Sequence, residues 1–187
     1  MKNKTFRRRA ALILLLFALA ALCACSKDEA AGYASVNGEI ITAEEIEYFK
    51  GRCRSEIINE YAGKYGVEDF SDFWDRDFDG MTPAQSLEKR ALDEAVSAKL
   101  KLVMMRENGI YDDISFAVLS EMAEKFNSEN ENASGVVGIK TIDADSFYTY
   151  YISTGELELK RILADGEYDA LLAERIKEAK IEVFDQY

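Results

Sequence analysis

Carboxylates are the most abundant side chains in this sequence that could do chemistry. The chain of 187 residues holds 35 Asp and Glu residues, three Cys and no His. A Ser or Cys nucleophile needs an adjacent base, and His is also the commonest metal ligand. The sequence therefore excludes a Ser-His-Asp set and any Cys/His metal cluster. Acidic pairs such as Asp112–Asp113 are frequent in a chain this acidic, so we predict solvated faces, no catalysis and no cofactor.

One acidic segment matches the opening of a calcium loop. The residues that fit the pattern D-x-D-x-D-G are Asp75, Asp77, Asp79 and Gly80. In such a loop the acidic side chains supply oxygen ligands and the glycine allows the sharp turn. The twelfth position should be a bidentate Glu and is Ser86, and Pro83 falls inside the loop. We therefore expect a solvated turn, with calcium at the three aspartates as the alternative.

Cys53 is the cysteine that lies inside the predicted fold. It belongs to a row of apolar residues spaced three or four apart, which are Ile46, Phe49, Cys53, Ile57, Tyr61 and Tyr65. This spacing is typical of the buried face of a helix. We expect Cys53 to be a core residue and not a nucleophile, because the chain offers no His partner.

The N-terminal segment has the layout of a secretory signal. Residues 1–24 open with a basic head and continue with an unbroken apolar run from Ala10 to Leu22. This run is shorter than the roughly 20 residues that a transmembrane helix needs. We therefore predict that residues 1–24 are a signal peptide and do not form a permanent membrane-spanning anchor.

The end of this segment indicates a lipid anchor. Leu22-Cys23-Ala24-Cys25 resembles the bacterial lipobox, in which a small residue precedes the cut and the cysteine carries the lipid. We expect a lipoprotein anchored through Cys25, on the extracytoplasmic side of a bacterial membrane. A cysteine with two or more acyl chains holds a protein stably at the bilayer. An ordinary signal peptide with incidental cysteines is the alternative.

The charge of the remaining chain argues against nucleic acid as a partner. Residues 1–24 contain five basic and no acidic residues, so removing them changes the formal charge from −12 to −17. A domain this acidic repels nucleic acid and anionic lipid headgroups. We assign residues 25–33 to a polar tether and residues 34–187 to one domain, which is long enough to bury a core.

A compact set of signals opens this domain. Val36, the pair Asn37-Gly38 and Ile40-Ile41 predict a small hairpin, because Asn-Gly supplies the positive φ angles of a primed turn. Thr42 followed by Glu45 is a capping box, which predicts a helix start. Strand, turn, strand and helix are therefore expected within a short stretch.

The rest of the domain reads as helical. The apolar spacing and the capping residues predict helices at Ala43–Tyr65, Pro83–Asn108, Ile114–Glu129, Ala144–Leu163 and Glu167–Ala179, with a loop at Asn127–Gly138. The alternating segment at Ile181–Phe184 is the last strand, and the hairpin is its only candidate partner. We predict a mainly α (α+β) fold, a bundle of about five helices with a small sheet formed by the hairpin and the C-terminal strand.

Three segments resemble the N-terminal domain of the SurA/PrsA group of extracytoplasmic chaperones and foldases. They are VNGEIITAEE, the long stretch from FWDRDFDGMTPAQ to MMRENGI, and the terminal KIEVFD. The resemblance implies a SurA-like helical cradle that holds extended, apolar stretches of unfolded chains. It also implies pairing of the terminal strand with the N-terminal segment. PrsA-like members are lipoproteins, which agrees with the prediction at Cys25.

The chain also departs from that family. Isomerases of the group carry a parvulin domain before the last helix, and only a short turn stands at Ala164–Glu167. The parvulin site uses histidines, which this chain lacks. We therefore expect a lipid-anchored module of the cell envelope that binds unfolded or secreted polypeptides without catalysis. An accessory lipoprotein with one folded partner and a diverged peptidyl-prolyl isomerase are the alternatives.

Aromatic residues are the candidates for peptide contacts. The chain has ten Phe, ten Tyr and one Trp, and tyrosine combines a flat apolar surface with a polar tip. Residues 147–151 place aromatic side chains on more than one helix face, so not all of them fit in a core. The predicted peptide-binding aromatics are Trp74, Tyr148, Tyr150 and Tyr151. The alternative is that the inward ones pack in the core and the others are half-buried at the surface.

Overall fold

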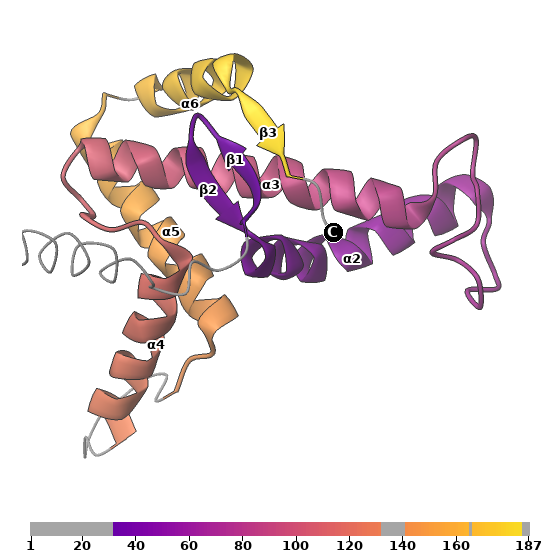
Figure 1. Cartoon of the computed structure of the whole chain (residues 1–187), viewed down its shortest axis with the longest axis horizontal. Coiled ribbons are helices and arrows are strands. Elements are labelled where there is room, and N and C mark those ends of the chain that lie inside the picture. The colour runs from indigo at the N-terminus through magenta and orange to yellow at the C-terminus, as the bar shows by residue number, and fades with distance from the viewer. Residues whose placement is uncertain (1–31, 132–140, 165, 185–187) are drawn as a thin grey trace, which may run out of the picture.

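A computed structural model describes residues 32–131, 141–164 and 166–184 (Figure 1). In chain order its elements are β1 (Gly32–Val36), β2 (Glu39–Thr42), α2 (Ala43–Tyr65), α3 (Pro83–Glu107), α4 (Phe116–Glu131), α5 (Ala144–Ile162), α6 (Glu167–Glu178) and β3 (Ile181–Val183). The predicted fold class, mainly helical with one small sheet, is confirmed. The predicted signal peptide and the lipidation residue Cys25 lie outside the described residues. None of the described helices is long and apolar enough to cross a membrane.

The sheet joins the two ends of the described chain. Its strand order is β2-β1-β3, and both pairs are antiparallel. Asn37 and Gly38 have φ angles of 52° and 86°, which make the tight turn between β1 and β2. Backbone hydrogen bonds from Phe184 N to Tyr33 O and from Asn37 N to Lys180 O, both 2.9 Å long, fasten β3 to β1. The predicted pairing of the hairpin with the C-terminal strand is therefore confirmed.

Helices α2 and α3 pack side by side and form a long arm (Figure 1). Both begin with the predicted capping boxes, Thr42 with Glu45 and Thr82 with Gln85. Gly66 ends α2 in the left-handed conformation that glycine adopts without strain. The tip of the arm is held by a small core made of Cys53, Ile57, Tyr61, Phe73 and Leu87. Cys53 is thus a buried free thiol.

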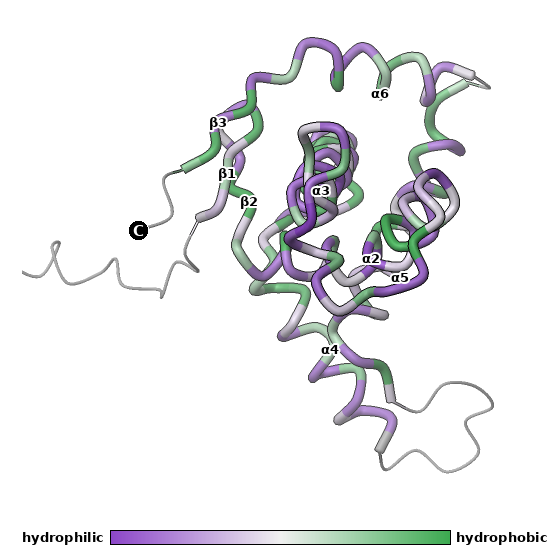
Figure 2. The backbone as a smooth tube through the Cα atoms, turned by 90° about the vertical axis from the view of Figure 1, so that its right-hand side faces the viewer, coloured by the Kyte–Doolittle hydropathy of each residue, from purple (hydrophilic) through white to green (hydrophobic). Residues whose placement is uncertain are grey.

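Helix α5 packs on α3, and α4 packs on α5 and projects away from α3 (Figure 2). The predicted boundaries of α4 were wrong at both ends. The helix starts at Phe116 because the Asp113 carboxylate accepts a hydrogen bond from Ser115 N in a turn before it. It continues past Asn127, which the sequence assigned to a loop. The Asn127 amide binds both the N–H and the carbonyl of Ile142, at 2.8 and 2.9 Å, so it holds the start of α5 from within α4.

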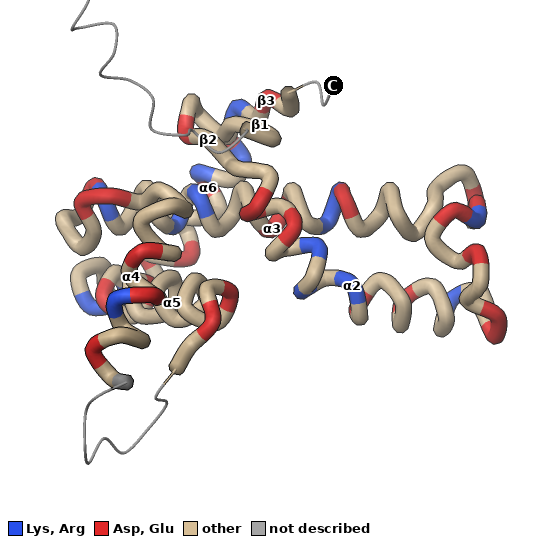
Figure 3. Tube along the Cα trace, turned by 60° about the horizontal axis from the view of Figure 1, so that its bottom comes forward, with Lys and Arg blue, Asp and Glu red and all other residues tan. Residues whose placement is uncertain are grey.

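Charged residues occur along every described helix, and in the whole chain acidic residues outnumber basic ones (Figure 3). Several ion pairs join elements that are distant in sequence. Arg106 on α3 pairs with Glu39 on β2, and Arg175 on α6 pairs with Glu107 on α3, each at 2.6 Å. Exposed pairs of this kind contribute little individually, but these two mark which side of α3 faces the sheet and α6.

Candidate functional site

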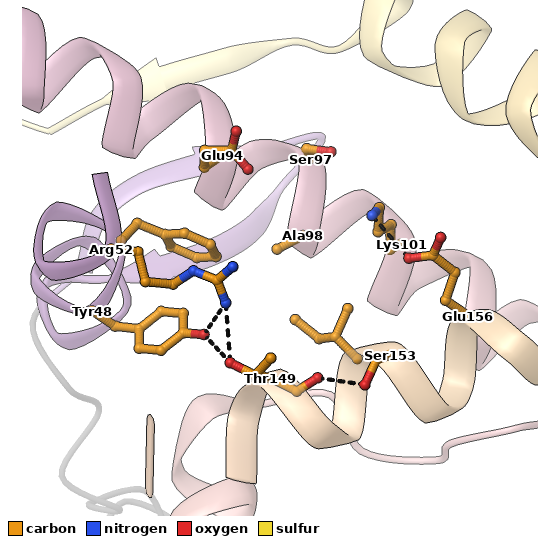
Figure 4. Close-up of a pocket in the computed structure, with 11 residues that line it drawn as sticks. Tyr48, Arg52, Glu94, Ser97, Ala98, Lys101, Thr149, Ser153 and Glu156 are labelled. Atoms are coloured by element: carbon orange, nitrogen blue, oxygen red, sulfur yellow. Dashed lines mark hydrogen bonds and ion pairs between the residues drawn. The ribbon is translucent and has the colours of Figure 1, made fainter. Parts of the chain in front are cut away.

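A cleft of about 170 Å³ opens where α2, α3 and α5 meet (Figure 4). Each helix contributes residues spaced three or four apart, which places them on one helix face. The lining residues are Tyr48, Phe49 and Arg52 from α2, Glu94, Ser97, Ala98 and Lys101 from α3, and Thr149, Ile152, Ser153 and Glu156 from α5. Because this cleft gathers polar and apolar side chains from three helices, we treat it as the candidate site.

The inner part of the cleft is apolar. Phe49, Ala98 and Ile152 line it, and the first two are buried. The Phe49 ring meets the Tyr48 ring edge-on at 4.9 Å, a geometry that aromatic pairs favour. A rigid aromatic wall next to small side chains leaves room for an apolar group of a ligand.

Arg52 gives the cleft a fixed positive group. Its Nη1 donates to the Tyr48 hydroxyl at 2.8 Å and to Thr149 Oγ1 at 3.0 Å. The hydrogen bond to Tyr48 raises the pKa of the Arg52 guanidinium, so the group stays charged. Among the described residues Arg52 makes no ion pair with a carboxylate. Its remaining donors are therefore free to bind an anionic group or a carbonyl oxygen.

The charges on the α5 side are already paired. Glu156 accepts from Lys101 at 2.9 Å and from Lys160 at 2.8 Å. Burial alone would raise the pKa of the Glu156 carboxyl, but the hydrogen bonds from the two lysines outweigh burial and lower it. Glu156 is therefore an ionised partner in an ion-pair network, and it is poorly suited to act as a general acid.

A second hollow of about 290 Å³ adjoins the cleft. It shares Tyr48, Arg52 and Thr149 with the first and adds Gly51, Asp145 and Ser146. The two hollows together follow the seam between α2 and α5. An elongated, shallow site of this kind suits consecutive groups of an extended chain better than one compact molecule.

Two of the predicted peptide-binding aromatics are buried, as the alternative of inward packing expected. Tyr148 is only 1% exposed, and its hydroxyl donates to Glu45 Oε1 at 3.1 Å inside the core. Tyr151 is also buried, and its ring stacks on Tyr111 with 3.8 Å between centroids. Both side chains face inward from α5 and fill the space that the prediction left open for a client.

The other two predicted aromatics reach the surface at separate places. Tyr150 is 57% exposed on α5. Trp74 is half-buried at the tip of the arm, where the Arg54 guanidinium lies 4.3 Å from the ring centroid. Neither residue lines the cleft. Trp74 and Tyr150 therefore do not share one surface with the cleft.

The three aspartates of the alternative calcium site do not form a ligand set. Asp77 accepts a hydrogen bond from Gly80 N at 2.9 Å, and Asp79 accepts one from the Tyr65 hydroxyl at 2.9 Å. Nowhere in the described part of the chain do three or more acidic, Cys or His side chains gather as a metal site would require. Asp77 and Asp79 instead use their carboxylates within the turn that leads into α3, and the backbone N–H of Asp75 donates to Asp72 O at 3.2 Å.

Comparisons with protein-family models, curated proteins and solved structures found no match to this chain. The resemblance to the SurA/PrsA group stays a prediction. The cleft residues were missed by sequence reasoning, although the polar residues Glu94, Ser97 and Lys101 follow helical spacing on α3 and could have indicated a second polar face.

Proposed function

We propose that this protein is a lipid-anchored, extracytoplasmic chaperone-like module that binds unfolded or extended polypeptide and catalyses no reaction. The proposal combines the resemblance of three sequence segments with the confirmed fold class. The observation that carries it is the cleft between α2, α3 and α5, which offers an apolar interior, a guanidinium without a paired carboxylate and several hydroxyl groups along one seam.

This mixture of groups matches the chemistry of an unfolded chain. Such a chain presents apolar side chains, carbonyl oxygens and charges at short intervals, without a fixed shape. The apolar interior around Phe49 and Ile152 can take a side chain, while Arg52 can donate to a carbonyl or carboxylate next to it. Shallow sites of this kind bind many sequences weakly, as a chaperone requires.

The exposed apolar residues also favour an extended partner. Ten large apolar side chains among the described residues are well exposed, namely Ile40, Phe70, Met81, Met122, Tyr150, Leu157, Ile162, Ile176, Ile181 and Val183. They are spread over the arm tip, α4, α5, α6 and the sheet instead of forming one large patch. A stable interface with one folded partner normally buries one continuous surface, so dispersed contacts fit an extended chain better.

The direct test is suppression of aggregation. The purified protein is mixed with one unfolded client at a time, and light scattering is followed as the molar ratio of protein to client is raised to one to one. We expect suppression near equimolar ratio. Ser153→Trp fills the cleft from its exposed rim and should weaken suppression, whereas the neighbouring Thr154→Trp does not line the cleft and should act as wild type. Absence of suppression with every client would overturn the proposal.

A separate experiment tests the proposal that the protein catalyses no proline isomerisation. In a refolding reaction limited by proline isomerisation, the protein at one-hundredth of the client concentration should leave the rate unchanged. Acceleration at that ratio would mean turnover and would favour the diverged isomerase.

A further inference from the structure

The outer edge of β3 carries backbone groups that pair with no other described strand. Tyr33–Phe184 and Asn37–Lys180 are hydrogen-bonded pairs of the β1–β3 ladder, and the register places Ser35 opposite Glu182 between them. In an antiparallel ladder alternate residues point their N–H and C=O toward the partner strand. Glu182 therefore faces β1, while the backbone groups of Ile181 and Val183 point away from it.

The two sheet edges differ in the described segments that lie beside them. Beyond β2, the segment 112–115 lies across a hollow that it lines together with Glu39 and Ile40. In the described part of the chain β3 pairs only with β1. Backbone groups on an open edge are a template for another strand.

The β3 edge also exposes apolar side chains. The register places Ile181 and Val183 on the same face as Val36 and Ala34, which are fully buried against the helices. Ile181 and Val183 are nevertheless 44% and 55% exposed, because β3 lies on the side of the sheet away from α3 (Figure 2). A neighbouring strand with apolar residues on this face would cover both side chains.

The opposite face of β3 carries a negative charge, which favours a basic residue in an added strand. Glu182 points there, and it makes no ion pair with any described residue. Opposite charges directly across a strand pair are favourable, and like charges are unfavourable. The residue of an added strand that lies opposite Glu182 should therefore be Lys or Arg.

The same geometry disfavours a second copy of this chain. A two-fold pairing of β3 with β3 that uses the outward groups of both Ile181 and Val183 must place Glu182 opposite Glu182. Two carboxylates would then face each other at the centre of a short interface. The net charge of −12 adds a general repulsion between copies.

We propose that the outer edge of β3 binds an extended client segment as a fourth strand, and that this segment carries a basic residue between two apolar residues. The inference rests on the proposed function and names the class of segment that one part of the protein selects. Client recognition would then use two places, with main-chain pairing at β3 and side-chain contacts in the cleft.

Labelled peptides test this inference. One peptide carries a central Val-Lys-Val and a second carries Val-Glu-Val, both flanked by the same polar residues. Binding is followed by fluorescence anisotropy. We expect the wild-type protein to bind the lysine peptide about two- to fivefold tighter, the range that one cross-strand charge pair supports. Glu182→Lys, a change at an exposed side chain, should reverse this preference. Equal binding of both peptides by both proteins would overturn the inference.

A proline substitution tests the proposed main-chain hydrogen bonds between β3 and the client strand. Val183→Pro removes an outward N–H that β1 does not use, so the β1–β3 ladder can persist. It should weaken binding of both peptides by at least tenfold. Ile40→Pro makes the equivalent change at the β2 edge and should bind as wild type.

If Val183→Pro binds both peptides normally while the wild type suppresses aggregation, the strand inference is wrong and the proposed function stands. A concentration-dependent dimer that Val183→Pro abolishes would identify a second copy as the occupant and overturn the inference.

Discussion

Lys99 on α3 lies 2.7 Å from the carboxylate of Glu45 on α2, and both side chains are buried. The same carboxylate accepts hydrogen bonds from Thr42 N and from the Tyr148 hydroxyl. Glu45 therefore caps the start of α2 and also neutralises a lysine in the core. The end of the hairpin, the two long helices and α5 meet at this one group.

Removing the lysine should destabilise the protein strongly. Lys99→Met leaves the Glu45 carboxylate buried without its counter-charge, so we expect a loss of about 3–5 kcal/mol in the free energy of unfolding. Urea titration followed by circular dichroism measures it. Lys89→Met on the same helix breaks only an exposed pair with Asp93 and should cost less than about 0.5 kcal/mol. Adding Glu45→Gln to Lys99→Met should recover part of the loss, and equal effects of the two single lysine variants would contradict this account.

Stability should fall at alkaline pH because several tyrosines are held neutral. Burial, followed by a hydrogen bond to Glu88, raises the pKa of Tyr33 to about 12, and burial raises the pKa of Tyr151 to about 12. In the unfolded chain a tyrosine has a pKa of about 10. The stabilisation is thus complete below pH 10 and is lost as the pH rises through 12, because the unfolded state releases its protons first.

Denaturant titrations between pH 8 and pH 12 check this prediction. Tyr33→Phe removes one of the titrating groups and should make the decline in unfolding free energy shallower than in the wild type. Tyr150→Phe, a change at an exposed side chain, is the matched control. A wild-type free energy that stays constant over this range would contradict the prediction.

Gly155 lets α5 approach α3 closely. A Cβ atom there would lie 2.5 Å from Met105 Sδ and 2.7 Å from Tyr111 Cε2. Gly155→Ala should therefore destabilise the protein by about 1–3 kcal/mol. Gly51→Ala on α2 meets no atom within 4 Å and should stabilise the protein by about 0.5–1 kcal/mol, since alanine favours the helix. Thermal and urea unfolding of the two variants should differ in sign, and a neutral Gly155→Ala would refute the close contact.

Calcium should leave the protein unchanged. Asp77 and Asp79 already accept hydrogen bonds within the turn, and their carboxylates do not converge on one point with a third ligand. The melting temperature in millimolar calcium and in excess chelator should agree within error. A calcium-dependent rise that Asp77→Asn removes would restore the alternative site.

Local signals predicted most of the fold. The Asn37-Gly38 turn, the boxes that begin at Thr42 and Thr82, and Gly66 each act within a few residues, so the sequence places them well. The C-terminal strand was predicted by elimination, because the chain offered one partner for it. The end of α4 was misplaced because Asn127 acts through a contact with Ile142, which has no local signature.

The site was predicted poorly for the same physical reason. Lys99 lies within the apolar stripe of α3, one turn from Val96 and Val103, and only the fold brings it to Glu45. Tyr148 was named as a possible peptide-binding residue, but its hydroxyl donates to the same carboxylate in the core. The cleft depends on three helices at once, so no single stretch of sequence encodes it.

Binding to one client in two states tests the central claim most directly. A labelled protein that can be prepared both natively folded and permanently unfolded is titrated with the purified full chain. The account predicts saturable binding of the unfolded form only, weakened by Ser153→Trp and not by Thr154→Trp. Binding of neither form, or equal binding of both, would contradict it.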